Sequence, residues 1–212
     1  MKIPNPFFKN KGPFKINLIL KKLNKEITAS EKNYEIFDIK DLVSSEENDI
    51  TFLNSSRYKD IASKTKALYC ITNSQLKKLL PNKCNKIIVD NVLLSMALIT
   101  EIFYPDAVND NYDHNLENIE NINFKEKINH GKNVLIGKNV DIGKNFSIGH
   151  NSILETNVKI GNNCSIGSNV IVRKTIINNN VKILDSCVIG KKGFGFFPNK
   201  NLNIRYPQIG MV

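Results

Sequence analysis

Apolar residues return at every sixth position through much of the second half of the sequence. With one position filled by Ser, the row runs through Leu116, Ile122, Ile128, Val134, Val140, Phe146, Ser152, Val158, Cys164, Val170 and Ile176. A second row, nearly as apolar, lies two residues later, from Ile136 to Val172. Two apolar positions separated by one residue are what a strand with one buried face requires, because successive side chains point to opposite faces. A period of six is not helical, so the sequence predicts a stack of short strands, a parallel β-helix.

Gly and Asn occupy the positions between the apolar pairs. Gly follows the second apolar position at residues such as Gly137 and Gly143, and Asn closes the hexads from Asn133 to Asn169. Both residue types tolerate positive φ, so we expect a corner at every repeat and three hexads per coil of a three-sided prism. The repeat from Ile176 to Asn180 is one residue short, and we expect that slip to fall at a corner, where the ladders keep their register.

Composition limits the class of protein. A chain of 212 residues can form one or two domains with a real core. No apolar run approaches the roughly 20 residues that span a bilayer, and residues 1–15 lack the apolar core of a signal peptide. We therefore expect a cytoplasmic protein without stable membrane insertion.

The net charge of +10 does not by itself indicate nucleic-acid binding. Lys residues are spread along the whole chain, and no DNA-binding or RNA-binding motif accompanies them, so we expect no nucleic-acid partner. A basic surface does favour encounter with an anionic protein or a diphosphate ligand. The four cysteines, Cys70, Cys84, Cys164 and Cys187, show no CxxC spacing, and we expect ordinary buried or reduced thiols and no metal.

A region of a different kind precedes the repeats. Strand and helix patterns alternate there, which indicates a small α/β domain at residues 1–105, followed by a polar connector at 106–115 and the β-helix at 116–212 with a loop at 191–207. Pro105 ends the last of the helices. The predicted elements are helices at 14–24, 74–80 and 92–104 and strands at 67–71 and 86–89.

Two stretches of sequence carry a family resemblance. Residues 48–58, NDITFLNSSRY, are similar to a pattern ending in ITFLxNPKY. Residues 188–196, VIGKKGFGF, followed by YPQIG at 206–210, are similar to a GxDGFGF loop and a PQIG segment. Together with an α/β domain ahead of the repeats, they resemble the UDP-3-O-acylglucosamine N-acyltransferases of lipid A biosynthesis in Gram-negative bacteria. The resemblance implies a uridine-nucleotide-binding α/β domain, a left-handed parallel β-helix and a homotrimer.

The resemblance also implies a binding site for UDP-3-O-acyl-glucosamine. Phe52 and Tyr58 match the aromatic residues that hold the uracil, and stacking a flat base on such rings contributes roughly 1 to 3 kcal/mol. Ser55 stands where the family has Asn, and its hydroxyl is a candidate for a bond to the base. Asn54 stands next to it. Arg57 matches the family's basic residue and is interpreted either as a diphosphate contact or as a solvated surface residue.

The glycine-rich loop completes the implied substrate site. We assign Gly193, Phe194, Gly195 and Phe196 to the substrate cleft against a neighbouring subunit. A bulge without function is the alternative. Lys192 replaces the usual Asp before the first Gly, so a carboxylate role at that position is absent.

The implied reaction moves an (R)-3-hydroxyacyl chain from acyl carrier protein to the 2-amino group of the sugar, without a cofactor. A His serves as general base, because its pKa lies near neutrality. The family's His lies on a later coil than the PQIG segment, whereas this sequence ends at Val212. We therefore expect no catalytic residue here and interpret the sequence as the N-terminal portion of a longer enzyme.

Three histidines remain to be placed. We expect His114 in solvent, His130 partly buried in a degenerate hexad, and His150 at a corner too early in the β-helix for catalysis. Two further classes of function stay open. One is a non-catalytic module that binds a UDP-sugar. The other is a hexapeptide-repeat protein of different chemistry, such as a zinc-dependent carbonic-anhydrase-like trimer, against which the scarcity of His argues.

Overall fold

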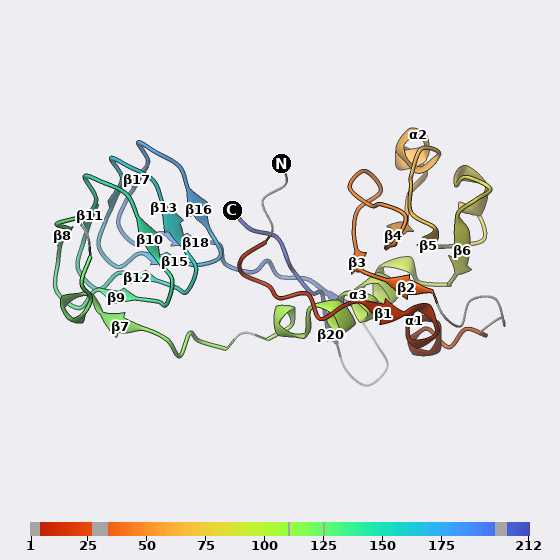
Figure 1. The fold of residues 1–212 in the computed structure, drawn as a ribbon, viewed down its shortest axis with the longest axis horizontal. Coiled ribbons are helices and arrows are strands. Elements are labelled where there is room, and N and C mark those ends of the chain that lie inside the picture. The colour runs from red at the N-terminus through yellow and green to blue at the C-terminus, as the bar shows by residue number, and fades with distance from the viewer. Residues whose placement is uncertain (1–4, 27–33, 110, 125, 198–202) are drawn as a thin grey trace. The chain divides into compact units, whose positions relative to one another are not determined.

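The computed structural model of the protein describes residues 5–26, 34–109, 111–124, 126–197 and 203–212. The chain divides into two compact units (Figure 1). The β-helix unit comprises the described residues of Met1–Phe8, Asp110–Phe194 and Gln208–Val212, and the α/β unit comprises those of Lys9–Asn109 and Gly195–Pro207. The mixed fold, a small α/β region and a left-handed parallel β-helix, is confirmed. The domain boundaries drawn from the sequence stay a prediction.

Short strands form the three faces of the β-helix unit. One sheet has the order β10-β13-β16, a second β17-β14-β11-β8 and a third β18-β15-β12-β9-β7. Apart from β7, all strands pair in parallel with the strand one coil away. The strands are β8 (Asn129–His130), β9 (Leu135–Ile136), β10 (Asp141–Ile142), β11 (Ser147–Ile148), β12 (Ile153–Leu154), β13 (Lys159–Ile160), β14 (Ser165–Ile166), β15 (Ile171–Val172), β16 (Ile176–Ile177), β17 (Lys182–Ile183) and β18 (Val188–Ile189).

The two apolar rows of the sequence point inward, as predicted. Val134, Leu154, Val158, Val170 and Val172 have no exposed surface. Ser152 shares this core and is satisfied there, because its Oγ donates to the Gly167 carbonyl oxygen at 2.8 Å and accepts from the Val170 N–H at 3.1 Å. A buried hydroxyl with both bonds made avoids the desolvation penalty of an unpaired polar group.

Asparagines form the corners, also as predicted. The Asn residues that close the hexads from Asn133 to Asn169 have φ between 54° and 65°. Their amides stack from coil to coil, with Asn133 Nδ2 donating to Asn151 Oδ1 at 3.1 Å and Asn151 Nδ2 to Asn169 Oδ1 at 3.3 Å. The corner conformation and the amide ladder together explain why Asn recurs at this position.

The glycines have a different role from the predicted one. Among the described glycines only Gly190 has positive φ, at 74°. A Cβ on Gly149 would lie 2.5 Å from the backbone nitrogen of Ser168, and a Cβ on Gly137 would meet the backbone nitrogen of Thr156. Gly is therefore needed because neighbouring coils approach too closely for a side chain.

The short repeat lies one hexad earlier than predicted. Lys159 pairs with Ile176 and Ile160 with Ile177, so the inward position belongs to Thr175, which is 2% exposed, and not to Ile176. The repeat with five residues is thus Val170–Lys174, and Lys174 takes the corner with φ of 51°. The slip does fall at a corner, and parallel pairing continues beyond it.

The first predicted hexads do not form a regular coil. Strand β7 (Glu117–Asn118) pairs antiparallel with β9, and a 3₁₀ turn, η5 (Ile119–Asn121), follows it. Ile119 rather than Leu116 is fully packed in the core, whereas Ile122 and Ile128 are partly buried against it. At the other end, the chain leaves the coil after Gly190 and returns to it at Val212, whose carbonyl oxygen accepts from the Ile176 N–H at 2.8 Å.

A parallel sheet organises the α/β unit. Its order is β3-β4-β5-β6, from β3 (Asp38–Ile39), β4 (Asp49–Leu53), β5 (Tyr69–Thr72) and β6 (Asn85–Ile88). Helix α3 (Val92–Phe103) contacts β3, β4 and β5 and also α1 (Ile16–Lys22). The remaining elements are the pair β1 (Phe14–Lys15) and β2 (Glu35–Ile36), helix α2 (Lys59–Ala62) and the 3₁₀ turns η2 (Ser56–Tyr58), η3 (Lys77–Leu79) and η4 (Pro105–Ala107).

Alternation along β4 divides its side chains between two layers. Leu53 is 1% exposed and belongs to a core cluster with Ala62 of α2 and the thiol-bearing residues Cys70 and Cys84. Ile50 and Phe52 point to the opposite side of the sheet, since successive side chains alternate. Phe52 therefore points to the opposite face of β4 from Leu53.

Two of the three helices predicted in this region are confirmed with shorter bounds, as α1 and α3. The helix predicted at residues 74–80 is wrong. The Asn73 side chain instead accepts from the N–H groups of Gln75 and Leu76 and holds a turn. Only the 3₁₀ turn η3 follows, and Leu80 is extended because it precedes Pro81.

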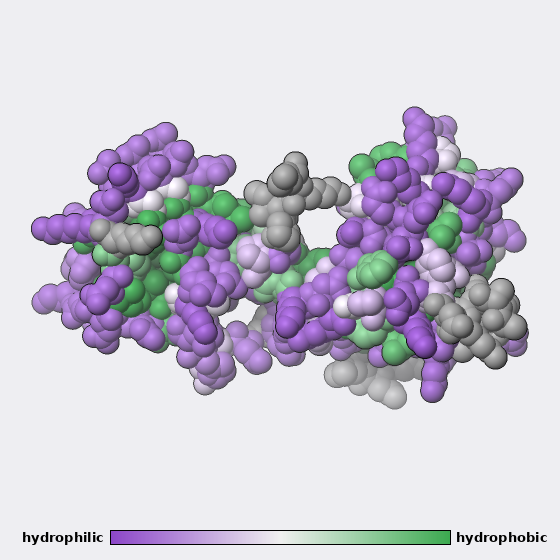
Figure 2. Space-filling model, viewed as in Figure 1, coloured by the Kyte–Doolittle hydropathy of each residue, from purple (hydrophilic) through white to green (hydrophobic). Residues whose placement is uncertain are grey.

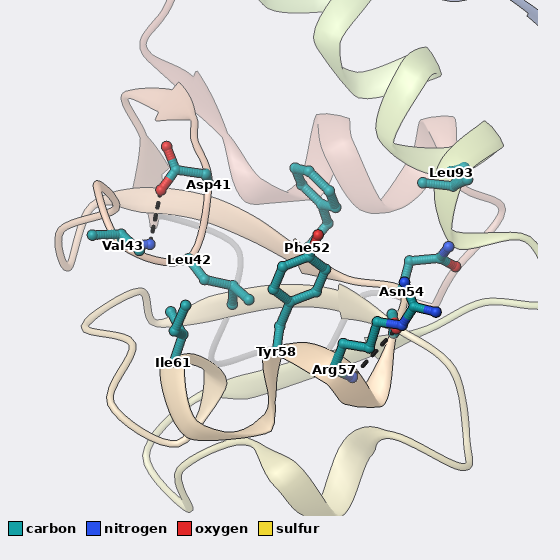
Figure 3. A pocket seen from close by; sticks show the side chains of 10 residues that line it. Asp41, Leu42, Val43, Phe52, Asn54, Arg57, Tyr58, Ile61 and Leu93 are labelled. Atoms are coloured by element: carbon teal, nitrogen blue, oxygen red, sulfur yellow. Dashed lines mark hydrogen bonds between the residues drawn. The ribbon is translucent and has the colours of Figure 1, made fainter.

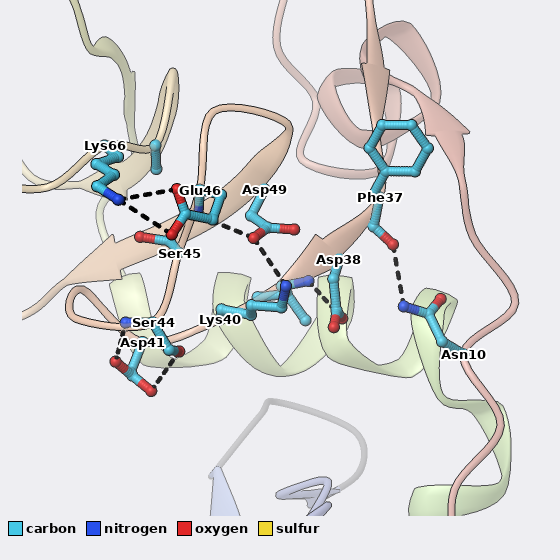
Figure 4. A network of polar contacts seen from close by, with 12 residues as sticks. Asn10, Phe37, Asp38, Lys40, Asp41, Ser44, Ser45, Glu46, Asp49 and Lys66 are labelled. Carbon is cyan, nitrogen blue, oxygen red and sulfur yellow. Dashed lines mark hydrogen bonds and ion pairs between the residues drawn. The ribbon is translucent and has the colours of Figure 1, made fainter. Parts of the chain in front are cut away.

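A network of carboxylates lies where β3 and β4 begin (Figure 4). Asp38 and Asp49 are register partners on these strands. Asp49 Oδ2 accepts from Lys40 Nζ at 2.9 Å, and Asp38 Oδ1 accepts from the Tyr104 hydroxyl at 2.8 Å. Burial raises the pKa of Asp38, against the opposing effect of the Tyr104 hydrogen bond. This network ties the residue that follows α3 to the edge of the sheet.

We predict that Gly137→Ala destabilises the β-helix unit. The added methyl group meets the backbone nitrogen of Thr156 on the next coil, and overpacking of this kind typically costs about 1 to 3 kcal/mol. The midpoint of thermal unfolding should fall accordingly. Gly210→Ala is the matched control, because nothing lies within 4 Å of a Cβ at that position. Equal midpoints for the two variants would contradict the role assigned to Gly137.

Candidate functional site

A cavity of about 600 Å³ opens at the carboxyl ends of β3 and β4 (Figure 3). This edge of a parallel sheet is the usual place for a ligand in α/β folds. Most of the lining is apolar or aromatic, with a few polar groups, as is typical of small-molecule sites. The lining residues are Asp41, Leu42, Val43, Phe52, Asn54, Ser55, Arg57, Tyr58, Ile61 and Leu93.

Strand β4 and the turn after it supply one wall of the cavity. Phe52 lies on β4, and Ser55 caps η2, since its Oγ accepts from the Arg57 N–H at 3.3 Å. The turn places Tyr58 at the rim, where it is 53% exposed. Figure 3 shows the Tyr58 hydroxyl directed toward Phe52. Two aromatic side chains thus face the same cavity from one continuous segment.

The turn after β3 supplies the opposite wall. The Asp41 carboxylate holds it, because Oδ1 accepts from the N–H groups of Val43 and Ser44 at 2.8 Å each and Oδ2 accepts from the Ser44 hydroxyl at 2.7 Å. These bonds present Leu42 and Val43 to the cavity. Val43 is 75% exposed, which leaves an apolar surface at the rim.

The two charged side chains of the lining differ in their hydrogen bonding. The carboxylate of Asp41 is occupied by its own turn, whereas Arg57 presents a guanidinium at the mouth of the cavity. Leu93 belongs to the first turn of α3, whose N-cap Asn91 accepts from the Leu94 N–H at 3.0 Å. A cationic side chain and a nearby helix N-terminus favour an anionic group on a ligand.

The residues predicted for the substrate site are only partly brought together. Phe52, Ser55 and Tyr58 line the cavity. Gly193 and Phe194 belong to the β-helix unit, and Gly195 and Phe196 belong to the α/β unit. None of these four lines the described cavity, and their predicted contact with substrate stays a prediction.

The segment after Gly195 forms a hairpin in the α/β unit. Strand β19 (Phe196–Phe197) pairs antiparallel with β20 (Ile204–Arg205). The following residue, Tyr206, packs its ring 5.4 Å from that of Phe197, and its hydroxyl donates to Met96 Sδ of α3 at 3.2 Å. Phe194, just before the hairpin, is 95% exposed.

Sequence reasoning missed several lining residues. Leu42, Val43 and Leu93 reach the cavity from segments remote from the ITFL motif, and no local pattern marks them. Arg57 was left between two interpretations, and the structure places it in the lining. Asn54 was noticed only as a neighbour of Ser55, although the alternation of a strand from Phe52 would have put it on the same side.

The histidines offer no catalytic arrangement. His114 is exposed, as predicted, but His130 is exposed too, since it lies on β8, the edge strand of its sheet. His150, Ser168 and Asp185 lie in one column of corners. Each binds the backbone of the preceding coil, with His150 Nδ1 accepting from the Lys132 N–H at 2.9 Å and Ser168 Oγ from the His150 N–H at 3.1 Å. They do not form a relay of side chains.

All four cysteines are free, and Cys70, Cys84 and Cys164 are buried, as predicted. Within the described ranges, no group of three or more His, Cys, Asp or Glu side chains is arranged to hold a metal ion. Among the same residues, no helix has the length and apolar character that crossing a membrane requires.

Two family models match the chain. Residues 33–102, within the α/β unit, match UDP-3-O-(3-hydroxymyristoyl) glucosamine N-acyltransferase, LpxD. Residues 139–174, within the β-helix unit, match the bacterial transferase hexapeptide model of six repeats. The first match includes the ITFL segment at residues 48–58, and the second falls on the six-residue repeats, whereas the glycine-rich loop and the PQIG segment lie outside both matches.

Curated proteins that are similar in sequence to this chain carry the same family name. A UDP-3-O-acylglucosamine N-acyltransferase of Rickettsia prowazekii is 30% identical over 105 residues, which is 48% of this chain and 30% of the relative. Relatives of the same name are 36% identical over 73 residues in Acinetobacter baumannii (34% of this chain, 20% of the relative) and 34% identical over 90 residues in Ruthia magnifica (42% and 26%). The aligned part of the chain thus spans less than a third of the length of these relatives. The resemblance to the UDP-3-O-acylglucosamine N-acyltransferases is confirmed over these partial matches.

Proposed function

We propose that the cavity of the α/β unit binds the uridine diphosphate part of a nucleotide sugar. The observation that carries this proposal is the pair Phe52 and Tyr58 on one cavity with Arg57 at its mouth. A pyrimidine base gains free energy by stacking on aromatic rings, and a guanidinium is suited to bind phosphate oxygens. The apolar side chains Leu42 and Val43 close the opposite wall and exclude water from the base.

The relatives' name suggests the reaction in which this binding serves. We propose that the complete protein is a cytoplasmic acyltransferase of lipid A synthesis, which transfers a 3-hydroxyacyl chain from acyl carrier protein to the 2-amino group of UDP-3-O-acyl-glucosamine. The C–S bond of the thioester breaks, an amide C–N bond forms, the amine loses a proton and the carrier thiol leaves. No cofactor enters this balance.

The residues of this chain contribute binding rather than proton transfer in the proposed mechanism. Phe52 and Tyr58 hold the base, and Arg57 offsets the charge of the diphosphate. The geometry of His114, His130 and His150 assigns the role of general base to none of them. A UDP-sugar-binding protein without transferase activity is therefore the second candidate, and nucleotide binding without acyl transfer would distinguish it.

A homotrimer is part of the proposed function. The outward positions of the four parallel strands of one sheet, β9, β12, β15 and β18, are apolar, and we call Leu135, Ile153, Ile171 and Val188 the outward row. Figure 2 shows apolar surface over β9, β12 and β15, bordered by polar side chains in this view. The equivalent positions of the sheet with β11 hold Asn129, Ser147, Ser165 and Lys182. We propose that the outward row packs against the neighbouring chains.

We predict that Phe52→Ala weakens binding of UDP by roughly 5- to 150-fold, because the lost stacking is worth about 1 to 3 kcal/mol. Isothermal titration calorimetry would measure the affinity, and thermal unfolding would show that the variant folds. Phe37→Ala is the matched control, since Phe37 is 45% exposed in the same unit but does not line the cavity. An unchanged affinity in Phe52→Ala would remove Phe52 from the site.

We predict that Ile153→Lys dissociates the trimer, because three buried ammonium groups cannot be paired at the apolar interface. Sedimentation velocity should show trimers for the unchanged protein and monomers for the variant. Ser147→Lys, at the outward position of a polar strand, should leave the trimer intact. A monomeric unchanged protein, or a trimeric Ile153→Lys variant, would contradict the proposed interface.

A further inference from the structure

The residue that would read the base can be identified from the geometry of the turn after β4. The sequence pattern points to Ser55, because the family's Asn aligns there. In the structure the Ser55 Oγ accepts from the Arg57 N–H at 3.3 Å and caps η2. A single hydroxyl that already holds its own turn is a poor match for a base edge that presents a donor and an acceptor side by side.

Asn54 lies on the correct side of the strand to take that role. Leu53 is 1% exposed and packs into the core behind the sheet. Phe52 projects to the other face of the strand, and Phe52 and Asn54, the first residue after β4, both line the cavity. The aromatic residue and the carboxamide are thus two positions apart on the same face.

The carboxamide of Asn54 has the chemistry that a uracil edge requires. Uracil presents an N3–H donor next to the C4 carbonyl acceptor, and a carboxamide offers an acceptor oxygen and an N–H donor with the same spacing. In Figure 3 the Asn54 amide lies beside the Arg57 side chain, and no hydrogen bond joins it to another of the residues drawn. Asn54 is exposed, so its amide is open to a ligand.

Neither the charged groups of the lining nor the hydroxyls of Ser55 and Tyr58 match it, because a hydroxyl carries its donor and its acceptor on one atom. Arg57 has donors only, and the Asp41 carboxylate is engaged by Val43 and Ser44. Among the described lining residues, Asn54 alone carries a separate donor and acceptor on one planar group. This leaves Arg57 for the diphosphate and Asn54 for the base.

We infer that Asn54 is the specificity-determining residue of this cavity and that its carboxamide pairs with the N3–H and C4 carbonyl of a uracil base. The inference rests on the proposed function, because it places a uridine nucleotide between Phe52 and Tyr58. Ser55 is a positioning residue that sets the turn carrying Arg57 and Tyr58. The position of the base-reading amide has thus moved by one residue relative to the pattern that the sequence resembles.

The test compares UDP with 3-methyluridine 5′-diphosphate, which lacks the N3–H. The unchanged protein should bind UDP about tenfold more tightly than the methylated nucleotide, the value of one or two hydrogen bonds. Asn54→Ala should weaken UDP binding by a similar factor and abolish most of the preference. Calorimetry gives both affinities, and thermal unfolding confirms that each variant folds.

Ser55→Ala is the control that separates the two neighbouring residues. It should lower the unfolding midpoint through loss of the η2 cap while it keeps the preference for UDP over the methylated nucleotide. Retention of that preference in Asn54→Ala, or its loss in Ser55→Ala, would overturn the assignment and leave uridine binding intact. If the unchanged protein binds neither nucleotide, the proposed function itself fails.

Discussion

Neighbouring coils of the β-helix unit pair through backbone hydrogen bonds, and the spacing that these bonds impose governs the rest of the unit. The Leu135 N–H donates to the backbone carbonyl oxygen of Ser152 at 3.0 Å, and the Ile153 N–H donates to that of Val170 at 2.8 Å. At this separation the backbone of one coil lies against the corner of the next, which excludes a Cβ at positions such as Gly149. The same spacing stacks inward side chains over one another, so that Val134, Ser152 and Val170 share one column of the core.

The repeating half of the fold could be predicted because each constraint recurs. When one hexad departs from the pattern, the neighbouring hexads still show it. The inward rows, the Asn corners and the three-sided coil all follow from the six-residue period. The predictions that were wrong concern single residues whose positions depart from the repeat. Thr175 takes an inward position that the period assigned to Ile176, because the preceding repeat is one residue short. His130 is exposed because it lies on the edge strand β8.

The α/β unit was harder to predict because its structure depends on contacts between remote segments. The apolar periodicity of α3 was sufficient to identify that helix. The pattern at residues 74–80 was misleading, since the Asn73 side chain and Pro81 favour a turn. For the cavity, the ITFL resemblance identified Phe52 and Tyr58. Nothing in the sequence indicated that the turn held by Asp41 would form the opposite wall.

The proposed function requires that the carboxyl ends of β3 and β4 hold a uracil between aromatic side chains, with its diphosphate near Arg57. A crystal structure of the protein grown with UDP tests it most directly. The account predicts electron density for the base in contact with Phe52 and Tyr58, and for phosphate oxygens within hydrogen-bond distance of Arg57. A nucleotide bound on the β-helix unit, or an empty cavity at saturating UDP, would contradict it.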